Sequence, residues 1–275
     1  MTVTDVNVVK SAIFERPDDA NKGTLGSLLC VCGSYGMAGA AVMSAKGALR
    51  TGIGLAKCAL PRSIYPIVAQ TILESVYYPL SENADGRISK VNVPFLVSES
   101  SKSSATLVGC GLGVCDDTLK IVFSLIENST TPLVLDADAL NCVAKQPEIL
   151  LRKKAPIIIT PHPGEMSRLT GLATPLVNAE RERVALDFTQ KYGVVTVLKG
   201  AGTVIASPNG KVLVNPTGNS GMATGGSGDV LAGMTASILA QGASAFSSAA
   251  AAVYLHGLAA VSYTHLRAHE TLRHL

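Results

Sequence analysis

The residues best suited to chemistry lie in a glycine-rich run over 218–233, GNSGMATGGSGDVLAG, in which five glycines fall within eleven residues. A helical pattern begins at Asp229. Glycines let backbone amides approach a ligand closely, and a helix start adds unpaired N–H donors, so the amides of 226–228 suit phosphoryl oxygens. Because a carboxylate repels phosphate, we interpret Asp229 as a base for a hydroxyl beside a phosphoryl group. The alternative is that Asp229 caps the helix.

Five other loops follow short apolar runs. The runs cover 28–32, 105–108, 132–135, 157–159 and 194–198, and the loops after them cover 33–41, 109–113, 136–141, 160–165 and 199–203. Runs that are apolar on both faces are typical of parallel strands covered by helices on both sides. The carboxyl ends of such strands meet at one edge of the sheet, where ligands bind. We therefore predict that the functional site lies at that edge.

Helical patterns alternate with the apolar runs and must position these loops. They cover 38–50, 117–127, 139–142 and beyond, 179–192, and 229–241. Segments 203–207 and 212–214, joined by a polar turn, predict a β-hairpin directly before the glycine run. With no repeat or linker in view, we expect one α/β domain: a central, mostly parallel sheet with helices on both faces.

Composition narrows the class of protein. The chain has 275 residues, 47% hydrophobic and 16% charged, so a large core is possible and disorder is not expected. The absence of Trp and a net charge of only +3 argue against a nucleic-acid-binding surface. Six cysteines without metal-type spacing predict buried thiols in a reducing cytoplasm. We expect no secretion signal, and no membrane span, because the apolar stretch 249–260 is too short.

Together these motifs resemble the ADP-dependent NAD(P)H-hydrate dehydratase family of the ribokinase-like superfamily. The matching segments are, in chain order, 16–23, 33–41, 48–54, 135–141, 160–169, 199–203 and 218–233. The Thr-Pro-His-Pro-Gly-Glu segment discriminates best, because sugar and vitamin kinases of the superfamily usually carry Asn where His162 stands. The resemblance implies a ribokinase-like fold and a repair reaction. ADP would phosphorylate the ring hydroxyl of hydrated NADH or NADPH, and loss of phosphate would leave NAD(P)H, AMP and phosphate.

The resemblance also implies a role for each candidate residue. Asp229 would deprotonate the hydroxyl at C6 of the hydrated nicotinamide, and Gly228 would help to hold the transferring phosphoryl group. Asp229 would bind the hydrated dinucleotide together with Ala40, Gly111 and His162. Gly228 would bind the adenine nucleotide together with Lys199, Gly200, Ala201, Gly202 and Thr203. Glu165 would organise Mg²⁺ through water.

Several of these residues have a structural alternative. His162 is alternatively a neutral residue of a proline-rich loop, Glu165 a first-turn helix acid, and 199–203 a β-turn. The roles of Asp136 and Asp138 stay open. Lys22 and Arg50 are either phosphate contacts or surface charges.

The C-terminal segment 261–275 departs from the family and holds three of the five histidines. His265 and His269 are four residues apart and would share a helix face, but no third metal ligand is evident. The segment is similar to translated sequencing-adapter read-through joined to a truncated gene. We therefore expect a domain over 1–260 and a non-native tail over 261–275.

Two other functions compete with this interpretation. One is a small-molecule kinase of the same fold, acting on a hydroxymethylpyrimidine, thiazole or pyridoxal substrate. The other is a nucleotide-binding regulator without catalysis, against which Asp229 counts. The resemblance to bacterial members favours ADP over ATP and implies a homotetramer.

Overall fold

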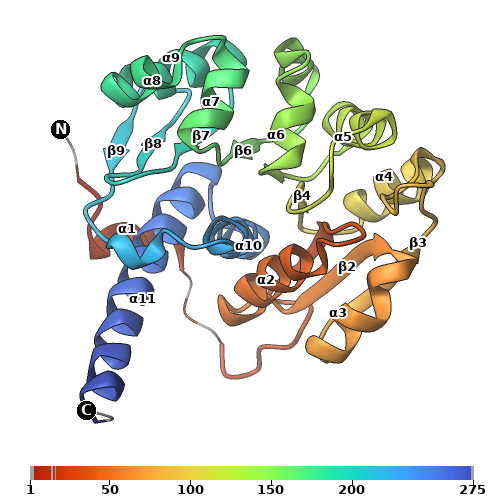
Figure 1. The fold of residues 1–275 in the computed structure, drawn as a ribbon, viewed down its shortest axis with the longest axis horizontal. Coiled ribbons are helices and arrows are strands. Elements are labelled where there is room, and N and C mark those ends of the chain that lie inside the picture. Colours follow the sequence, from red (N-terminus) through yellow and green to blue (C-terminus); the bar gives the residue numbers. More distant parts are fainter. Residues whose placement is uncertain (1–2, 14, 16, 274–275) are drawn as a thin grey trace.

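The computed structural model describes residues 3–13, 15 and 17–273, and it contains a nine-stranded sheet in the order β3-β2-β1-β4-β5-β6-β7-β8-β9 (Figure 1). The strands are β1 Ser27–Val31, β2 Leu55–Pro61, β3 Val76–Leu80, β4 Ala105–Val108, β5 Leu133–Leu135, β6 Ile157–Ile159, β7 Val195–Leu198, β8 Val204–Ala206 and β9 Val212–Val214. Neighbours from β3 to β7 pair in parallel, and β8 and β9 are added antiparallel. The predicted mostly parallel sheet is confirmed.

Helices precede, connect and follow the strands. They are α1 Val6–Ala12, α2 Ala38–Arg50, α3 Tyr65–Thr71, α4 Val93–Ser101, α5 Asp116–Asn128, α6 Asp138–Val143, α7 Pro163–Thr170, α8 Thr174–Ala179, α9 Arg181–Tyr192, α10 Ser227–Ala240 and α11 Ala245–Arg273. Short 3-10 turns cover Arg62–Ile64, Lys90–Asn92, Pro147–Arg152 and Ser220–Met222.

The sheet separates two hydrophobic cores because successive side chains of a strand point to opposite faces. On β1, Leu28 and Cys30 join one core, with residues of α2, α3, α10 and α11. Leu29 and Val31 join the other, with residues of α4 to α9. The predicted covering of both faces is therefore confirmed, and all six cysteines are free thiols.

The predicted elements differ from the observed ones in several places, and helices α1, α3 and α4 were not expected. The helix expected over 179–192 is observed as α9, which begins at Arg181, and the short helix α8, which ends at Ala179, was not expected. The helix expected from Asp229 begins earlier, at Ser227. Strands β2 and β3 were not expected, because Lys57 interrupts the apolar run of β2 and the edge strand β3 is partly exposed. The predicted hairpin is confirmed as β8 and β9.

Helix α11 is longer than the apolar stretch 249–260 suggested. Residues 245–262 are long and apolar enough to cross a bilayer by length and composition alone. Residues 249–253 of this stretch are at most 3% exposed and belong to the core shared with α2 and α10, so packing inside the protein accounts for their apolar character. Side chains from 263 onward, including those of His265 and His269, lie outside the described residues.

Helix α10 reaches the centre of the molecule because glycines let it approach α2 (Figure 1). A Cβ on Gly233 would lie 2.0 Å from the carbonyl oxygen of Ser44, and one on Gly47 would lie 2.7 Å from the carbonyl oxygen of Val230. These two carbonyl oxygens belong to helix backbone, which cannot shift to make room for a Cβ as the flexible end of a side chain can. Any larger residue at either position would therefore push the two helices apart.

We expect Gly233→Ala to destabilise the protein by about 1–3 kcal/mol, because it overpacks a backbone contact. Gly39→Ala is the matched control, because Gly39 is exposed in α2 and a Cβ there meets only the end of Met43, at 4.0 Å. Its effect should lie between zero and a gain of about 1 kcal/mol. Urea unfolding midpoints at equal m-values measure both. Equal midpoints for the two variants would contradict the proposed packing.

Candidate functional site

Asp229 lies in the first turn of α10, at the end of the glycine run. Gly226, not Asp229, is the N-cap residue, with φ +88°. Asp229 is three residues further on, and no side-chain capping hydrogen bond is formed at this helix start. The alternative that Asp229 caps the helix is therefore wrong. Its carboxylate is left available for another partner, beside the N–H groups of the first turn.

A buried ion pair at the carboxyl edge of the sheet faces this turn. Nζ of Lys199, directly after β7, lies 2.8 Å from Oδ1 of Asp136, directly after β5. The hydroxyl of Thr160, directly after β6, donates to the same oxygen at 2.7 Å. A Cβ on Gly228 would lie 3.3 Å from Nζ of Lys199, so the glycine run and the ion pair are neighbours. Three strand ends and α10 thus converge on one point, as the sequence predicted.

Cys110 completes this cluster. One ligand atom each of Cys110, Asp136 and Asp229 lie within 4.8 Å of one another. Contact with the Cys32 thiol and burial raise the pKa of the Cys110 thiol well above its ordinary value, so it stays protonated. It donates to Oδ2 of Asp136 at 3.8 Å. Cys110 was not predicted as a site residue, and its position between Gly109 and Gly111 was the one signal in the sequence.

Burial and the neighbouring charge of Asp136 raise the pKa of Asp229 from 3.8 to about 6. The side chain of Lys199 stays positively charged. Although burial works against its ammonium, the carboxylates of Asp136 and Glu165 raise its pKa above the ordinary value. A carboxylate with a pKa near 6 is ionised at neutral pH and yet basic enough to accept a proton. The cluster therefore presents a proton acceptor beside a fixed positive charge.

His162 and Glu165 form a reciprocal cap at the start of α7. Nδ1 of His162 accepts from the amides of Gly164 at 3.0 Å and Glu165 at 3.3 Å, and the amide of His162 donates to Oε2 of Glu165 at 2.8 Å. Burial and Lys199 lower the pKa of His162, so it is neutral and carries its proton on Nε2. Burial raises the pKa of Glu165, whose Oε2 lies 3.9 Å from Nζ of Lys199. The structural alternatives for both residues hold, and both also border the cluster.

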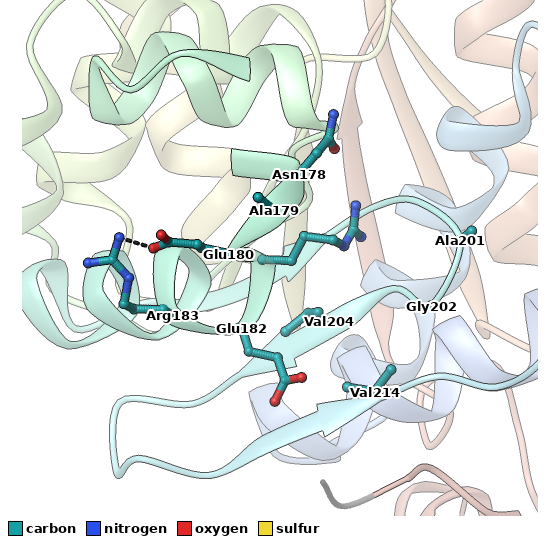
Figure 2. A pocket seen from close by; sticks show the side chains of 10 residues that line it. Asn178, Ala179, Glu180, Glu182, Arg183, Ala201, Gly202, Val204 and Val214 are labelled. Atoms are coloured by element: carbon teal, nitrogen blue, oxygen red, sulfur yellow. Dashed lines mark ion pairs between the residues drawn. The ribbon is translucent and has the colours of Figure 1, made fainter. Parts of the chain in front are cut away.

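The loop 199–203 makes a tight turn between β7 and β8. Gly200 and Gly202 have φ values of +148° and +65°, and the Thr203 hydroxyl donates to the carbonyl of Gly200 at 3.0 Å. Ala201 and Gly202 line a cavity of about 790 Å³ whose wall also includes Val204 and Val214 of the hairpin (Figure 2). The β-turn alternative is thus correct as a description of the backbone. The same turn also forms part of the cavity wall.

The remaining candidates divide between the two edges of the sheet. Ala40 and Gly111 are buried neighbours at the carboxyl edge, since a Cβ on Gly111 would lie 2.7 Å from that of Ala40. Lys22 and Arg50 lie at the opposite edge: Lys22 contacts Gly54, just before β2, and Arg50 ends α2. A phosphate contact at this site is therefore wrong for Lys22 and Arg50, and the surface-charge alternative is correct.

Asp138 has its own anchoring role. Its Oδ2 accepts from the amide of Gly113 at 2.8 Å, and its Oδ1 accepts from Asn141 at 3.3 Å. Ala137, which separates it from Asp136, has φ +48° and ψ −115° and is the one non-glycine residue with positive φ in the described part of the chain. Such strain is concentrated at functional sites. On either side of this residue, Asp136 contacts Lys199 and Asp138 contacts the loop at Gly113.

Comparison with known proteins gives one consistent family. The sequence matches the carbohydrate-kinase family described as NAD(P)H-hydrate dehydratase over residues 28–274. It is 40% identical over 196 residues to the bifunctional NAD(P)H-hydrate repair enzyme of Thermofilum pendens, a match covering 71% of this chain and 37% of that protein. It is 36% identical over 197 residues to the ADP-dependent (S)-NAD(P)H-hydrate dehydratase of Neisseria meningitidis serogroup B, covering 70% of this chain and 62% of that protein. The chain thus spans little more than a third of the bifunctional relatives it matches.

Comparison with solved structures points to the same family. The ADP/ATP-dependent NAD(P)H-hydrate dehydratase of Bacillus subtilis, co-crystallised with ATP and Mg²⁺, superposes with a TM-score of 0.80 at 32% identity, over 95% of this chain and 88% of that one. A ribokinase of Thermotoga maritima superposes with a TM-score of 0.54 at 14% identity, over 86% of this chain and 89% of that one. The second likeness shows the fold alone, and it confirms the expected ribokinase-like architecture.

We expect Asp229→Asn to stabilise the fold at pH 8 and to have no such effect near pH 4. The folded-state pKa of about 6 lies above the ordinary 3.8, so the folded state disfavours the ionised form. This destabilisation is fully present above pH 6 and disappears as the pH falls toward 3.8. Asn is neutral at every pH and removes it.

Melting temperatures of the parent and Asp229→Asn across pH 4–8 measure this difference. Asp136→Asn is the control, because it leaves the buried Lys199 ammonium without its partner and should lower the melting temperature at pH 8. A pH-independent gap between the parent and Asp229→Asn would contradict the raised pKa.

Proposed function

This chain belongs to the NAD(P)H-hydrate dehydratase family, and we propose that it restores NADH and NADPH from their hydrated forms at the expense of ADP. The observation that carries the proposal is the position of Asp229. It is a half-buried carboxylate with a pKa of about 6 in the first turn of α10, close to Asp136 and Cys110 and to the Lys199 ammonium beside Gly228. This arrangement suits proton removal from a hydroxyl that attacks a phosphoryl group.

In the proposed reaction, Asp229 accepts the proton of the hydroxyl at C6 of the hydrated ring. The hydroxyl oxygen bonds to the β-phosphorus of ADP, and the bond from that phosphorus to the bridging oxygen breaks, so AMP leaves. The ring C–O bond then breaks and phosphate departs as C5 loses a proton, which restores the double bond. Donors at the start of α10, including the amide of Gly228, stabilise the charge on the transferring group.

We assign the adenine nucleotide to Lys199, Gly200, Ala201, Gly202 and Thr203 together with Gly228, and the hydrated dinucleotide to Ala40, Gly111, His162 and Asp229. The proximity of Lys199 to Gly228 supports the first group, and that of Gly111 to Ala40 supports the second. The Nε2 proton of the neutral His162 is available as a donor to the dinucleotide. We assign this activity to residues 1–260, within which the buried part of α11 ends at Gly257.

Mg²⁺ fits the same edge of the sheet. Mg²⁺ prefers oxygen ligands, keeps several waters and is often held by one or two carboxylates plus substrate phosphates. Glu165 has its Oε1 near His162 at 3.5 Å and its Oε2 on the His162 amide, so it would hold the ion through water rather than directly. When bound, Mg²⁺ would neutralise the charge of the phosphates.

The cellular setting is part of the proposal. The described thiols are all free, which suits a reducing cytoplasm. We propose a soluble homotetramer that takes ADP and hydrated NADH or NADPH as its substrates. A small-molecule kinase of the same fold would instead release a stable phosphorylated product.

We expect Asp229→Asn to lower turnover of hydrated NADPH at least about a hundredfold, because it removes the proton acceptor. ADP affinity should stay equal or improve, because a negative charge near phosphate is lost. The absorbance of restored dihydronicotinamide and calorimetry with ADP measure the two effects. Asp187→Asn, at an exposed position of α9, is the matched control and should change neither. Turnover of Asp229→Asn within about threefold of the parent would refute the mechanism.

We expect Gly202→Val to weaken ADP binding at least about tenfold. A Cβ at Gly202 meets only Val214, at 3.5 Å, so the damage comes from φ +65°, which a β-branched residue cannot adopt without moving the turn. Gly210→Val is the control, because Gly210 has φ +88° in the hairpin turn away from the cavity. Calorimetry with ADP should separate the two variants. If they bind ADP equally well, residues 199–203 are not the nucleotide loop.

A further inference from the structure

Arg181, the first residue of α9, lies against the turn that follows β7. Its Nη2 donates to the carbonyl of Leu198 at 2.8 Å. A Cβ on Gly200 would lie 2.5 Å from Nη1 and 2.9 Å from Nη2, so the guanidinium packs directly on Gly200. The planar cation therefore backs the turn 199–203 from the side of α9.

The charge of Arg181 has no carboxylate partner within the part of the chain that the structure describes. Its neighbour Glu180 pairs instead with Arg183. Nε of Arg181 is inaccessible to solvent and makes no hydrogen bond to the described residues. Burial lowers the pKa of Arg181, yet a guanidinium remains charged in proteins. A half-buried cation without a counter-charge is unfavourable for the fold, so a bound anion would explain why it stands here.

A cavity of about 790 Å³ lies beside Arg181. Arg181 lines it together with Ala201 and Gly202, and its volume is in the range of small-molecule sites. Figure 2 shows Ala201 and Gly202 on one side of this cavity and the Glu180–Arg183 pair on the other. Arg183 pairs with Glu180, whereas Arg181 and Glu182 of the same wall form no ion pair within the described residues. Of these two, Arg181 is the one that packs on the turn, at Gly200.

We propose that Arg181 is the positioning residue that sets the affinity of the turn 199–203 for the diphosphate of ADP. Its guanidinium holds the carbonyl of Leu198 and the backbone of Gly200, and its positive charge lies behind the turn that faces the phosphates. The inference rests on the proposed function, in which this turn binds ADP. It adds a residue from another helix, which acts through the loop and not on the reacting hydroxyl.

The test compares Arg181→Gln and Arg181→Lys with Arg183→Gln. The last variant is a matched control, since it removes one guanidinium from the same helix and the same cavity. For Arg181→Gln we expect the dissociation constant and KM for ADP to rise at least about tenfold, as loss of a charge-assisted contact predicts. The kcat at saturating ADP and the KM for hydrated NADPH should stay within about threefold of the parent. Arg181→Lys keeps the charge. On a logarithmic scale, its dissociation constant for ADP should therefore lie at least halfway back from that of Arg181→Gln to that of the parent.

The outcomes separate this inference from the proposed function. If the parent protein does not bind ADP in calorimetry, the proposed function itself is wrong. If the parent binds ADP but Arg181→Gln and Arg183→Gln bind it equally well, Arg181 has no such role. Loss in Arg181→Gln without recovery in Arg181→Lys would overturn the role of the charge. An equal rise of both KM values with a lowered melting temperature would show a merely structural residue and would also overturn the proposal.

Discussion

The buried ion pair between Lys199 and Asp136, 2.8 Å long, joins parts of the chain that are 63 residues apart. It connects the ends of β5 and β7, and Thr160 adds the end of β6 from between them. Such a pair is stable only when further hydrogen bonds satisfy its remaining polar atoms. Here Thr160 and the protonated thiol of Cys110 do so for Asp136. This contact therefore ties three neighbouring strand ends together at the carboxyl edge.

The same pair determines the chemistry beside it. The negative charge of Asp136, after burial, raises the pKa of Asp229, while the ammonium of Lys199 opposes that rise. A carboxylate with a raised pKa and a buried ammonium therefore lie near each other without forming a direct ion pair within the described residues. Arg181 extends the positive side beneath the turn 199–203, on the face of the sheet that carries α9.

Close packing of α10 against its neighbouring helices positions Asp229 beside this ion pair. Glycines at the contact between α2 and α10 leave no room for side chains, so α10 lies deep in the fold and its first turn meets the ends of the central strands. The alanine-rich part of α11 then covers α10 from its other side. The small residues of α2, α10 and α11 thus allow the close packing that positions the Asp229 carboxylate.

The sequence by itself determined the alternation of strands and helices, the hairpin before the glycine run, and the edge at which the site forms. These depend on local periodicity and on the rule that parallel strands end together, which a single chain displays. It did not determine that Glu180 divides two helices, that Gly226 is the cap of α10, or that Cys110 and Arg181 border the site. Only the tertiary structure decided these, because each depends on a contact between residues distant in the chain or on a backbone angle. Lys22 and Arg50 show the same limit: both are basic residues in matching motifs, yet Lys22 precedes β1 and Arg50 ends α2 ahead of β2, which places them at the opposite edge of the sheet.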